Sequence, residues 1–262
     1  MLPGVYRAEK KDGTVYYRAS ITYRNKHISL GSFSDEEAAH RAYVVSGELL
    51  DGKLSDDYEP GIPLPFKKWV SLINFRDNDM YIKTPIYLKE RFFYYYFAPE
   101  DYLIFDSDDL FYYSTHSIMR RGGHLFVADF GMQVNILSRY GIKNYAVKGR
   151  DFIFVNGDDT DYRRSNIRVI NIYNGVQKKE QGARVFYETK IHIRGDVLVG
   201  RYPSEWEAAA AYNKAVHILS RNENSRNYTK NYIVELNADE YREIYNRVNV
   251  SAAIYEFADD GR

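Results

Sequence analysis

Residues 155–170, VNGDDTDYRRSNIRVI, concentrate side chains that could act on a phosphodiester. An Asp or His before the Asn156–Asp158 turn and a later Asn or His, such as Asn166, could hold a divalent metal ion, which balances charge on a scissile phosphate. Hydrolysis also needs a general base beside the attacking water, most often a histidine. The four residues just upstream are Asp151, Phe152, Ile153 and Phe154. None is histidine, so the segment has the surroundings of a hydrolytic site without its base.

Composition narrows the classes of protein that the chain can be. Of its 262 residues 45% are hydrophobic, which is enough for ordinary packed cores. No apolar run approaches the roughly 18 residues that a membrane span needs, so we expect no membrane contact. The absence of cysteine excludes disulfides and cysteine-bound zinc, and it fits a reducing cytosol. A formal charge of zero argues against a uniformly basic surface but leaves room for local basic faces.

The chain contains an internal repeat, and we name residues 4–50 the first repeat and residues 175–219 the second repeat. The matched positions are Gly4-Val5 with Gly175-Val176, Leu30–Phe33 with Val199–Tyr202, and Ala42-Tyr43 with Ala211-Tyr212. The offset drifts only between 171 and 169, as small differences in turn length would produce. One supersecondary unit therefore occurs twice.

Each repeat predicts three strands followed by a helix. In the first repeat Tyr17, Ala19 and Ile21 alternate with polar residues, the period of a half-buried strand. Asp12-Gly13 and Arg24-Asn25 are typical of hairpin turns. Capping boxes, Ser34 with Glu37 and Ser204 with Glu207, predict where the helices begin.

The helix of such a unit covers one face of its sheet, and we call the opposite face the outer face. Residues 1–33 carry six basic side chains against two acidic ones, and residues 171–203 carry six against three. Each predicted sheet therefore carries a net positive charge, although the formal charge of the whole chain is zero. The expected outer-face residues are Tyr6, Lys10, Arg18, Ser20, Thr22, His27 and Ser29 in the first repeat and Gln177, Lys179, Glu188, Lys190, His192 and Arg194 in the second. Such a face could enter a DNA major groove, or it could simply be solvated.

With these motifs in view, both repeats resemble the Apetala or ethylene-response-factor type of DNA-binding domain. The shared features are the initial Gly-Val, an aromatic-x-Ala-x-Ile strand, Leu-Gly-x-Phe, and a helix with Glu-x-Ala-Ala and Ala-Tyr. The first repeat, YYRASI…ISLGSFSDEEAAHRAY, is close to the bacterial form, and the second is more diverged. The resemblance implies that the sheet lies in the major groove with the helix behind it. It places contacts at Tyr6, Lys10, Arg18, Ser20, Thr22 and Ser29.

Bacteria and phages carry this domain fused to HNH homing endonucleases, and residues 97–171 resemble that partner in pattern. FAPEDYLIFDSDDLFYY is similar to its opening, and GRDFIFVNGDDTDYRRSNIRVI to its asparagine-rich core. The alignment puts Phe154 at the general base, Ile153 at the first metal ligand, and Asn166 at the third position. A phenyl ring can neither accept a proton nor bind a metal, and loss of a general base alone costs roughly 10²–10⁴-fold in rate.

Several alternatives stay open at this stage. The degenerate segment could be a scaffold in which Asn166 bonds the backbone of the turn, while Arg163 and Arg164 meet phosphate or pair with nearby aspartates. A rebuilt nuclease could use Asp151 or His124 with Asn166. The acidic stretch Asp106–Asp109 could instead mark a protein-interaction module. A metal site could draw on the following residues: His116, His124, Asp106, Asp108, Asp109 and Asp129.

The expected fold is α+β, with two domains of a three-stranded antiparallel sheet plus helix flanking a degenerate HNH-like (ββα) middle. The domains run over 1–55, 97–172 and 173–222, with a linker and connecting strands at 56–96 and a helical extension at 223–262. The expected function is sequence-specific binding of double-stranded DNA without cleavage or cofactor, by a regulator from a phage or mobile element in the bacterial cytosol. The expected contacts are Tyr6, Lys10, Arg18, Ser20, Thr22, Ser29, Gln177, Lys179, Lys190, His192, Arg194, Arg163 and Arg164.

Overall fold

The computed structural model describes residues 1–221 and 227–259. The helices are α1 (Glu36–Leu50), α2 (Phe66–Asn78), α3 (Leu110–Thr115), α4 (Glu205–Leu219), α5 (Ala238–Arg247) and α6 (Ala252–Asp259). The strands are β1 (Val5–Glu9), β2 (Val15–Tyr23), β3 (Lys26–Phe33), β4 (Ile86–Leu88), β5 (Phe92–Ala98), β6 (Asp101–Asp106), β7 (Ile118–Arg121), β8 (His124–Asp129), β9 (Met132–Asn135), β10 (Phe152–Phe154), β11 (Ile167–Val169), β12 (Val176–Gln181), β13 (Arg184–His192) and β14 (Asp196–Tyr202).

The predicted α+β class is confirmed, since the described residues form several small three-stranded antiparallel sheets and six helices. The chain folds as two compact units. One comprises Met1–Val134 with Asp158–Asn166, and the other comprises Asn135–Gly157 with Ile167–Arg262. None of the described helices is long and apolar enough to cross a membrane.

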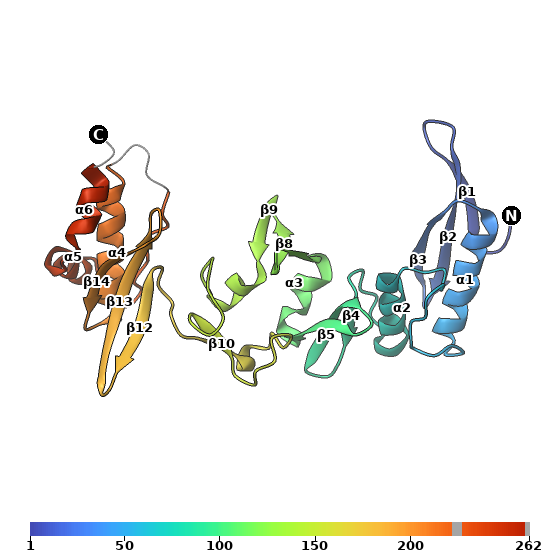
Figure 1. Ribbon diagram of the computed structural model, residues 1–262. Coiled ribbons are helices and arrows are strands. Elements are labelled where there is room, and N and C mark those ends of the chain that lie inside the picture. Colours follow the sequence, from blue (N-terminus) through green and yellow to red (C-terminus); the bar gives the residue numbers. More distant parts are fainter. Residues whose placement is uncertain (222–226, 260–262) are drawn as a thin grey trace. The chain divides into compact units, whose positions relative to one another are not determined.

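Each repeat forms the predicted three strands and helix, β1–β3 with α1 and β12–β14 with α4 (Figure 1). The likeness extends to the register. A bulge interrupts the pairing between Ala19 and Ser20 in one sheet and between Thr189 and Lys190 in the other. These sites are equivalent, so the two sheets share an irregularity that re-aims the side chains after it.

A glycine opens each repeat because a tyrosine ring lies against it. Gly4 and Gly175 have φ angles of 74° and 72°, and rings of Tyr43 and Tyr212 respectively approach them. The carbonyl of each glycine also accepts from the residue after the bulge, Ser20 N at 3.0 Å and Lys190 N at 2.8 Å. The Gly-Val and Ala-Tyr signatures of the sequence are thus two halves of one contact.

Replacing Gly175 by alanine should lower the free energy of unfolding by roughly 3 kcal/mol. The new Cβ would lie 2.3 Å from the carbonyl oxygen of Lys190 and 2.4 Å from the Tyr212 ring, at a φ that disfavours any side chain. Gly182→Ala is the matched control, because Gly182 has φ 61° but open space around it, and strain alone should cost about 1 kcal/mol. Equal losses in urea titrations of the two variants would refute the packing argument.

The first helix begins one residue later than its sequence suggests. Asp35, not Ser34, is the N-cap, and its carboxylate accepts from Ala38 N at 2.7 Å. The expected Ser34–Glu37 box is therefore wrong: a carboxylate next in the chain takes the capping position. At α4 Ser204 is the N-cap as predicted, accepting from Glu207 N at 3.2 Å.

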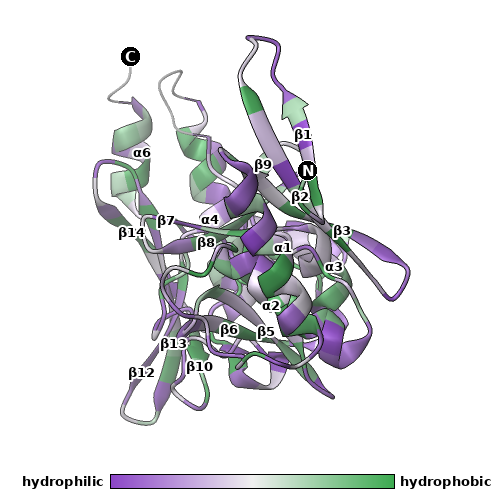
Figure 2. Ribbon diagram, turned by 90° about the vertical axis from the view of Figure 1, so that its right-hand side faces the viewer, coloured by the Kyte–Doolittle hydropathy of each residue, from purple (hydrophilic) through white to green (hydrophobic). Residues whose placement is uncertain are grey.

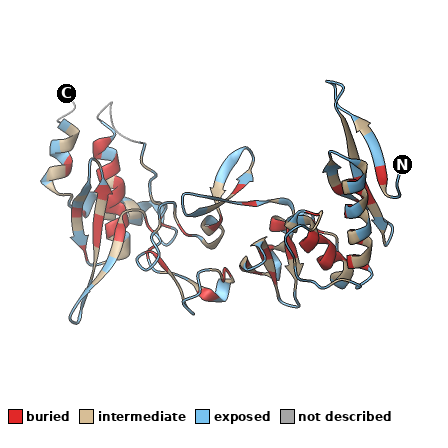
Figure 3. Cartoon of the chain, turned by 45° about the vertical axis from the view of Figure 1, so that its right-hand side comes forward, coloured by how far each residue is buried: buried red, intermediate tan, exposed pale blue. Residues whose placement is uncertain are grey.

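The two repeats differ in what covers their helices. In Figure 3 α4 is buried along most of its length, because α5 and α6 pack on it, while α1 keeps an exposed side. Val248 and Ile254 join the core of the second repeat. The Lys214 ammonium donates to the carbonyls of Tyr245 and Val248 at the end of α5, at 3.0 and 2.8 Å. The segment predicted as a helical extension thus shares the core of the second repeat.

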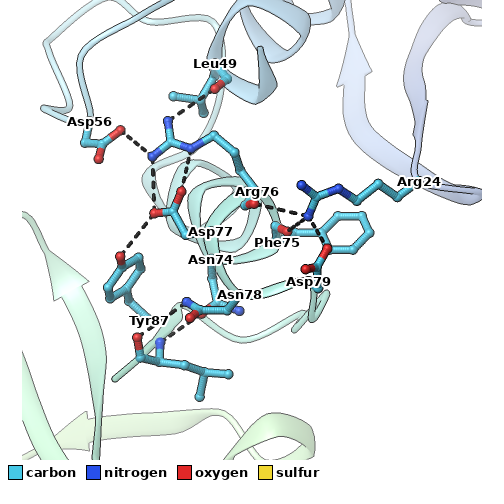
Figure 4. A network of polar contacts seen from close by, with 11 residues as sticks. Arg24, Leu49, Asp56, Asn74, Phe75, Arg76, Asp77, Asn78, Asp79 and Tyr87 are labelled. Carbon is cyan, nitrogen blue, oxygen red and sulfur yellow. Dashed lines mark hydrogen bonds and ion pairs between the residues drawn. The ribbon is translucent and has the colours of Figure 1, made fainter. Parts of the chain in front are cut away.

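Helix α2 was not among the expected elements, and it packs against the first repeat. Trp69, Leu72 and Phe75 belong to the same core as α1 and its sheet. In Figure 4 Arg76 reaches the Leu49 carbonyl at 3.3 Å, Asp56 at 2.8 Å and Asp77 at 2.7 Å. The Arg24 guanidinium, from the turn between β2 and β3, donates to the last carbonyls of α2 and pairs with Asp79.

The stretch before α2, which has the composition of a linker, is also packed. Leu64 is buried, the Tyr58 hydroxyl donates to its carbonyl at 2.6 Å, and the Trp69 indole donates to the Asp56 carbonyl at 2.9 Å. By contrast the β1–β2 hairpin ends in a hydrophilic tip, visible in Figure 2, that includes Lys10, Lys11 and Asp12.

The middle of the chain forms sheet β4–β6, with β5 at its centre. Phe93 and Tyr95 are buried, and Phe92, Tyr94 and Tyr96 are half-buried on the other face. Residues 158–166 are fastened to β6. Ile104 exchanges backbone hydrogen bonds with Thr160 and Tyr162, at 2.9 and 2.8 Å, and the Tyr162 ring packs 5.6 Å from Phe105.

The region expected to be HNH-like has the hairpin of a ββα unit but not its helix. Phe152–Phe154 pairs antiparallel with Ile167–Val169. Residues 170–175 then contain no helix, and β12 starts at Val176. The ββα expectation is wrong in this respect, because six residues that include the Asn174-Gly175 turn leave no room for a helix before the second repeat.

Candidate nucleic-acid interface

The outer face of β1–β3 has an arginine at its centre. Tyr6, Arg18 and Ser32 form one row across the three strands, and all three are exposed. The Arg18 guanidinium pairs with no carboxylate among the described residues. Its Nη2 donates to the Tyr16 hydroxyl at 2.6 Å, and it lies 5.3 Å from that ring. Tyr16 therefore positions the Arg18 guanidinium without neutralising its charge.

Around Arg18 most expected contacts are exposed as predicted: Tyr6, Lys10, Thr22, His27 and Ser29. Ser20 is the exception, with only 8% of its surface exposed. It lies on the central strand directly after the bulge. We therefore remove Ser20 from the accessible part of the face.

The outer face of β12–β14 has a glutamate at the position equivalent to Arg18. Gln177, Glu188 and Arg201 form the row that matches Tyr6, Arg18 and Ser32. The Glu188 carboxylate accepts from Arg201 Nε at 3.0 Å and pairs with Lys190 Nζ at 3.1 Å. We call Glu188, Lys190 and Arg201 the charged triad.

Glu188 is buried beneath the two cations, with 9% of its side chain exposed, although the sequence places it on the open face. Burial would raise the pKa of its carboxyl, but hydrogen bonds from Lys190 and Arg201 outweigh burial and hold the pKa below its ordinary value. Glu188 therefore stays ionised at neutral pH, and part of the positive charge of this sheet is internally compensated.

The remaining expected contacts of the second repeat lie at or near its edge. His192 Nδ1 is 2.9 Å from Asp196 Oδ1 at the β13–β14 turn. Arg194 lies in that turn rather than on a strand, where it is exposed. Gln177 and Lys190 line a cavity of about 280 Å³ together with residues of the loop 143–151. The basic side chains of this sheet therefore extend from the charged triad to the β13–β14 turn.

The three positions that the resemblance aligns with an HNH site hold two half-buried apolar side chains and one buried amide. Ile153 and Phe154 are half-buried on β10, and the Phe154 ring lies 5.8 Å from that of Phe152. Asn166 is buried, and its amide donates to the carbonyls of Asp158 and Asp161 at 3.1 and 2.8 Å. The predicted bonding of Asn166 to the turn backbone is confirmed.

Asp151, proposed as a base for a rebuilt nuclease, is a structural carboxylate. It is 1% exposed and accepts from Val147 N at 2.8 Å and from Arg150 Nη2 at 2.7 Å, with Lys143 Nζ 3.2 Å away. Burial would raise its pKa, but these hydrogen bonds and charges prevail and lower it. A carboxylate with so low a proton affinity and so many donors is poorly suited to accept a proton from water.

The two arginines of the hairpin loop are tied to their surroundings. Arg163 pairs with the buried Asp161 at 2.7 Å and lies 5.5 Å from the Phe92 ring. The backbone N–H of Arg164 donates to Asp106 Oδ2 at 2.7 Å. The structure thus places Arg163 in the intramolecular pair that the sequence left open as an alternative to phosphate.

The histidines considered for a metal site lie apart from a ligand set. His116 Nε2 is 3.6 Å from Asp129 Oδ1, and its ring stacks on Tyr112 at 4.2 Å. His124 is exposed after the Gly122-Gly123 turn that joins β7 and β8. In the part of the chain that the structure describes, no three His, Asp or Glu side chains gather as metal ligands.

No known protein family, curated protein or solved structure matches the chain. The residues themselves must therefore carry any functional conclusion.

Arg201 and Ser32 were missed among the outer-face residues. The place of Arg201 opposite Glu188 follows from a register that the bulge sets, and the bulge has no clear signal in the sequence. A regular pairing without the bulge would have shifted that register by one residue and turned Arg201 to the other face.

Proposed function

We propose that the chain binds double-stranded DNA in a sequence-dependent way through the outer faces of its two repeats and does not cleave it. In this proposal the repeats are Apetala-type readers, and the segment between them derives from an HNH nuclease. Its setting is the bacterial cytosol, as a regulator from a phage or mobile element. The observation that carries the proposal is the open face of β1–β3, with Arg18 uncompensated at its centre.

Charge and shape both support a duplex as the partner. A three-stranded antiparallel sheet can enter a major groove, and exposed cations such as Arg18 and Lys10 suit the phosphates that line it. Two readers on one chain also raise the effective concentration of the second after the first has bound, when both can reach their half-sites. The side chains at the HNH-aligned positions, Ile153 and Phe154, supply neither a base nor a metal ligand.

A titration of labelled duplexes at several salt concentrations tests the proposal. About six phosphate contacts predict a slope near −5 for the logarithm of the binding constant against the logarithm of salt concentration. A preference for some duplexes over others should persist at high salt, since base contacts release few counterions. Binding without either salt dependence or sequence preference would contradict the proposal.

Incubation of supercoiled plasmid with Mg²⁺ or Mn²⁺ tests the absence of cleavage. We expect no nicking. Nicking that disappears in a folded Asn166→Ala variant would favour the active HNH-like nuclease instead, and it would leave the binding part of the proposal standing.

A further inference from the structure

The ion pair between Glu188 and Arg201 leaves part of the Arg201 guanidinium without a partner among the described residues. Glu188 binds Arg201 through Nε only, and among the described residues neither Nη atom of Arg201 has a partner. The Arg201 side chain is 63% exposed, in contrast to the 9% of Glu188. The fork of two Nη donors therefore points away from the carboxylate that holds it.

The Arg201 guanidinium is positioned from a second side as well. It lies 5.6 Å from the ring of Phe186, which is two residues before Glu188 and shares its face. Behind the strand, Ser251 N donates to the carbonyl of Val199 at 2.9 Å, so the edge of β14 is also fixed. An arginine whose plane is set in this way loses less rotamer entropy on binding than a free one.

We propose that Arg201 reads a guanine in the major groove through its two Nη donors, with Glu188 as the positioning residue. This inference rests on the proposed function. A planar fork of two donors matches the O6 and N7 acceptors of guanine, which no other base presents together in the major groove. Glu188 satisfies the third donor, Nε, and keeps it from competing for the same acceptors.

The first repeat cannot make the same contact. Ser32 stands where the second repeat has Arg201, and Arg18 stands where it has Glu188. The arginine of the first face lies on the central strand and that of the second on the edge strand. The two repeats should therefore require different bases, and the preferred site should be neither a palindrome nor a direct repeat.

Selection from a pool of random-sequence duplexes by the full chain, followed by affinity measurements on the selected duplex, tests the proposal. For Arg201→Lys, which keeps the charge but loses the fork, we expect the preference for one guanine to fall roughly 10- to 100-fold. Preferences at other positions should persist. Glu188→Gln should weaken the same position to a smaller degree. Arg242→Lys, an exposed arginine of α5, is the matched control and should change nothing, because α5 packs on α4 behind the sheet.

Replacing the selected guanine by 7-deazaguanine, which lacks the N7 acceptor, separates base reading from a phosphate contact. The wild-type chain should lose affinity for that duplex, and Arg201→Lys should be indifferent to the change. Loss of affinity that is uniform over all sequences and insensitive to N7 would overturn the inference, because Arg201 would then touch only phosphate. Failure of the wild-type chain to enrich any sequence would instead overturn the proposed function, and this inference with it.

Discussion

Arg18→Glu is expected to weaken duplex binding by the full chain on the order of 100-fold. The substitution removes the only arginine at the centre of the first outer face and puts a carboxylate against the phosphates. Because no described carboxylate pairs with Arg18, its loss frees no internal partner that could compensate. Fluorescence anisotropy with a labelled duplex, at several salt concentrations, measures the effect.

Arg7→Glu is the control for this experiment, since it makes the same charge change on the same sheet. Arg7 is exposed but pairs with Tyr17, whose side chain faces α1, so it lies off the outer face. We expect Arg7→Glu to reduce binding only modestly, through the long-range field of the molecule. Equal effects of the two reversals would indicate a general electrostatic attraction and would count against a specific face.

Arg18 has no compensating carboxylate among the described residues, whereas Arg201 does. In the proposed function, the two repeats should therefore contribute differently to DNA binding. An uncompensated cation attracts any phosphate backbone, whereas a cation held by a glutamate gains less from phosphate alone. In the proposed function, the first repeat would therefore supply much of the salt-sensitive affinity. The second repeat would contribute selectivity, because ligands that do not satisfy Arg201 gain little there.

Features that depend on neighbouring residues were predictable from the sequence. The hairpin turn at Arg24-Asn25 and the helix after Asn237 follow from local turn and capping chemistry, and both are present. The repeat was also visible, because Gly175 and Tyr212 recur at the spacing of Gly4 and Tyr43. Contacts of this kind constrain residue type at fixed positions.

Features that depend on long-range packing were not predictable in the same way. Ser20 is buried directly after a bulge that no single residue type announces, and Glu188 is buried beneath Lys190 and Arg201. Helix α2 was missed because the residues before it have the composition of a flexible linker, and only the packed structure shows Leu64 in the core. The helix expected after β11 came from the family resemblance, and the shortness of residues 170–175 rules it out.

Asp151→Asn is expected to lower the free energy of unfolding of the second unit by about 3 kcal/mol at neutral pH. The substitution leaves Lys143, whose side chain is 12% exposed, without its carboxylate, and it removes the charge that holds Arg150. Urea denaturation followed by fluorescence measures the loss. Asp196→Asn, an exposed aspartate of the same unit with a single ion pair to His192, should have little effect.

The effect should depend on pH in one direction. Because the folded state lowers the pKa of Asp151 below its ordinary value of 3.8, the carboxylate stabilises the fold at all pH values above that. Its contribution disappears as pH falls through the lower, folded pKa. The gap in stability between wild type and Asp151→Asn should therefore be constant from pH 5 to 8 and close only in acid, as measured by denaturation across that range (about pH 2–8). A gap that widens in acid would mean that the carboxylate is protonated in the folded state.

Asp151 also connects the loop 143–151 to the start of the second repeat, so we expect its loss to act locally. Lys143 donates to the Tyr173 carbonyl at 2.6 Å, and the Asn171 amide donates to the Arg150 carbonyl at 2.6 Å. In Asp151→Asn, amide hydrogen exchange should accelerate in residues 143–151 and 171–176 and stay unchanged in β1–β3. Acceleration in β1–β3 would mean that the loop supports the whole chain. No acceleration anywhere would show that the carboxylate does not organise the loop at all.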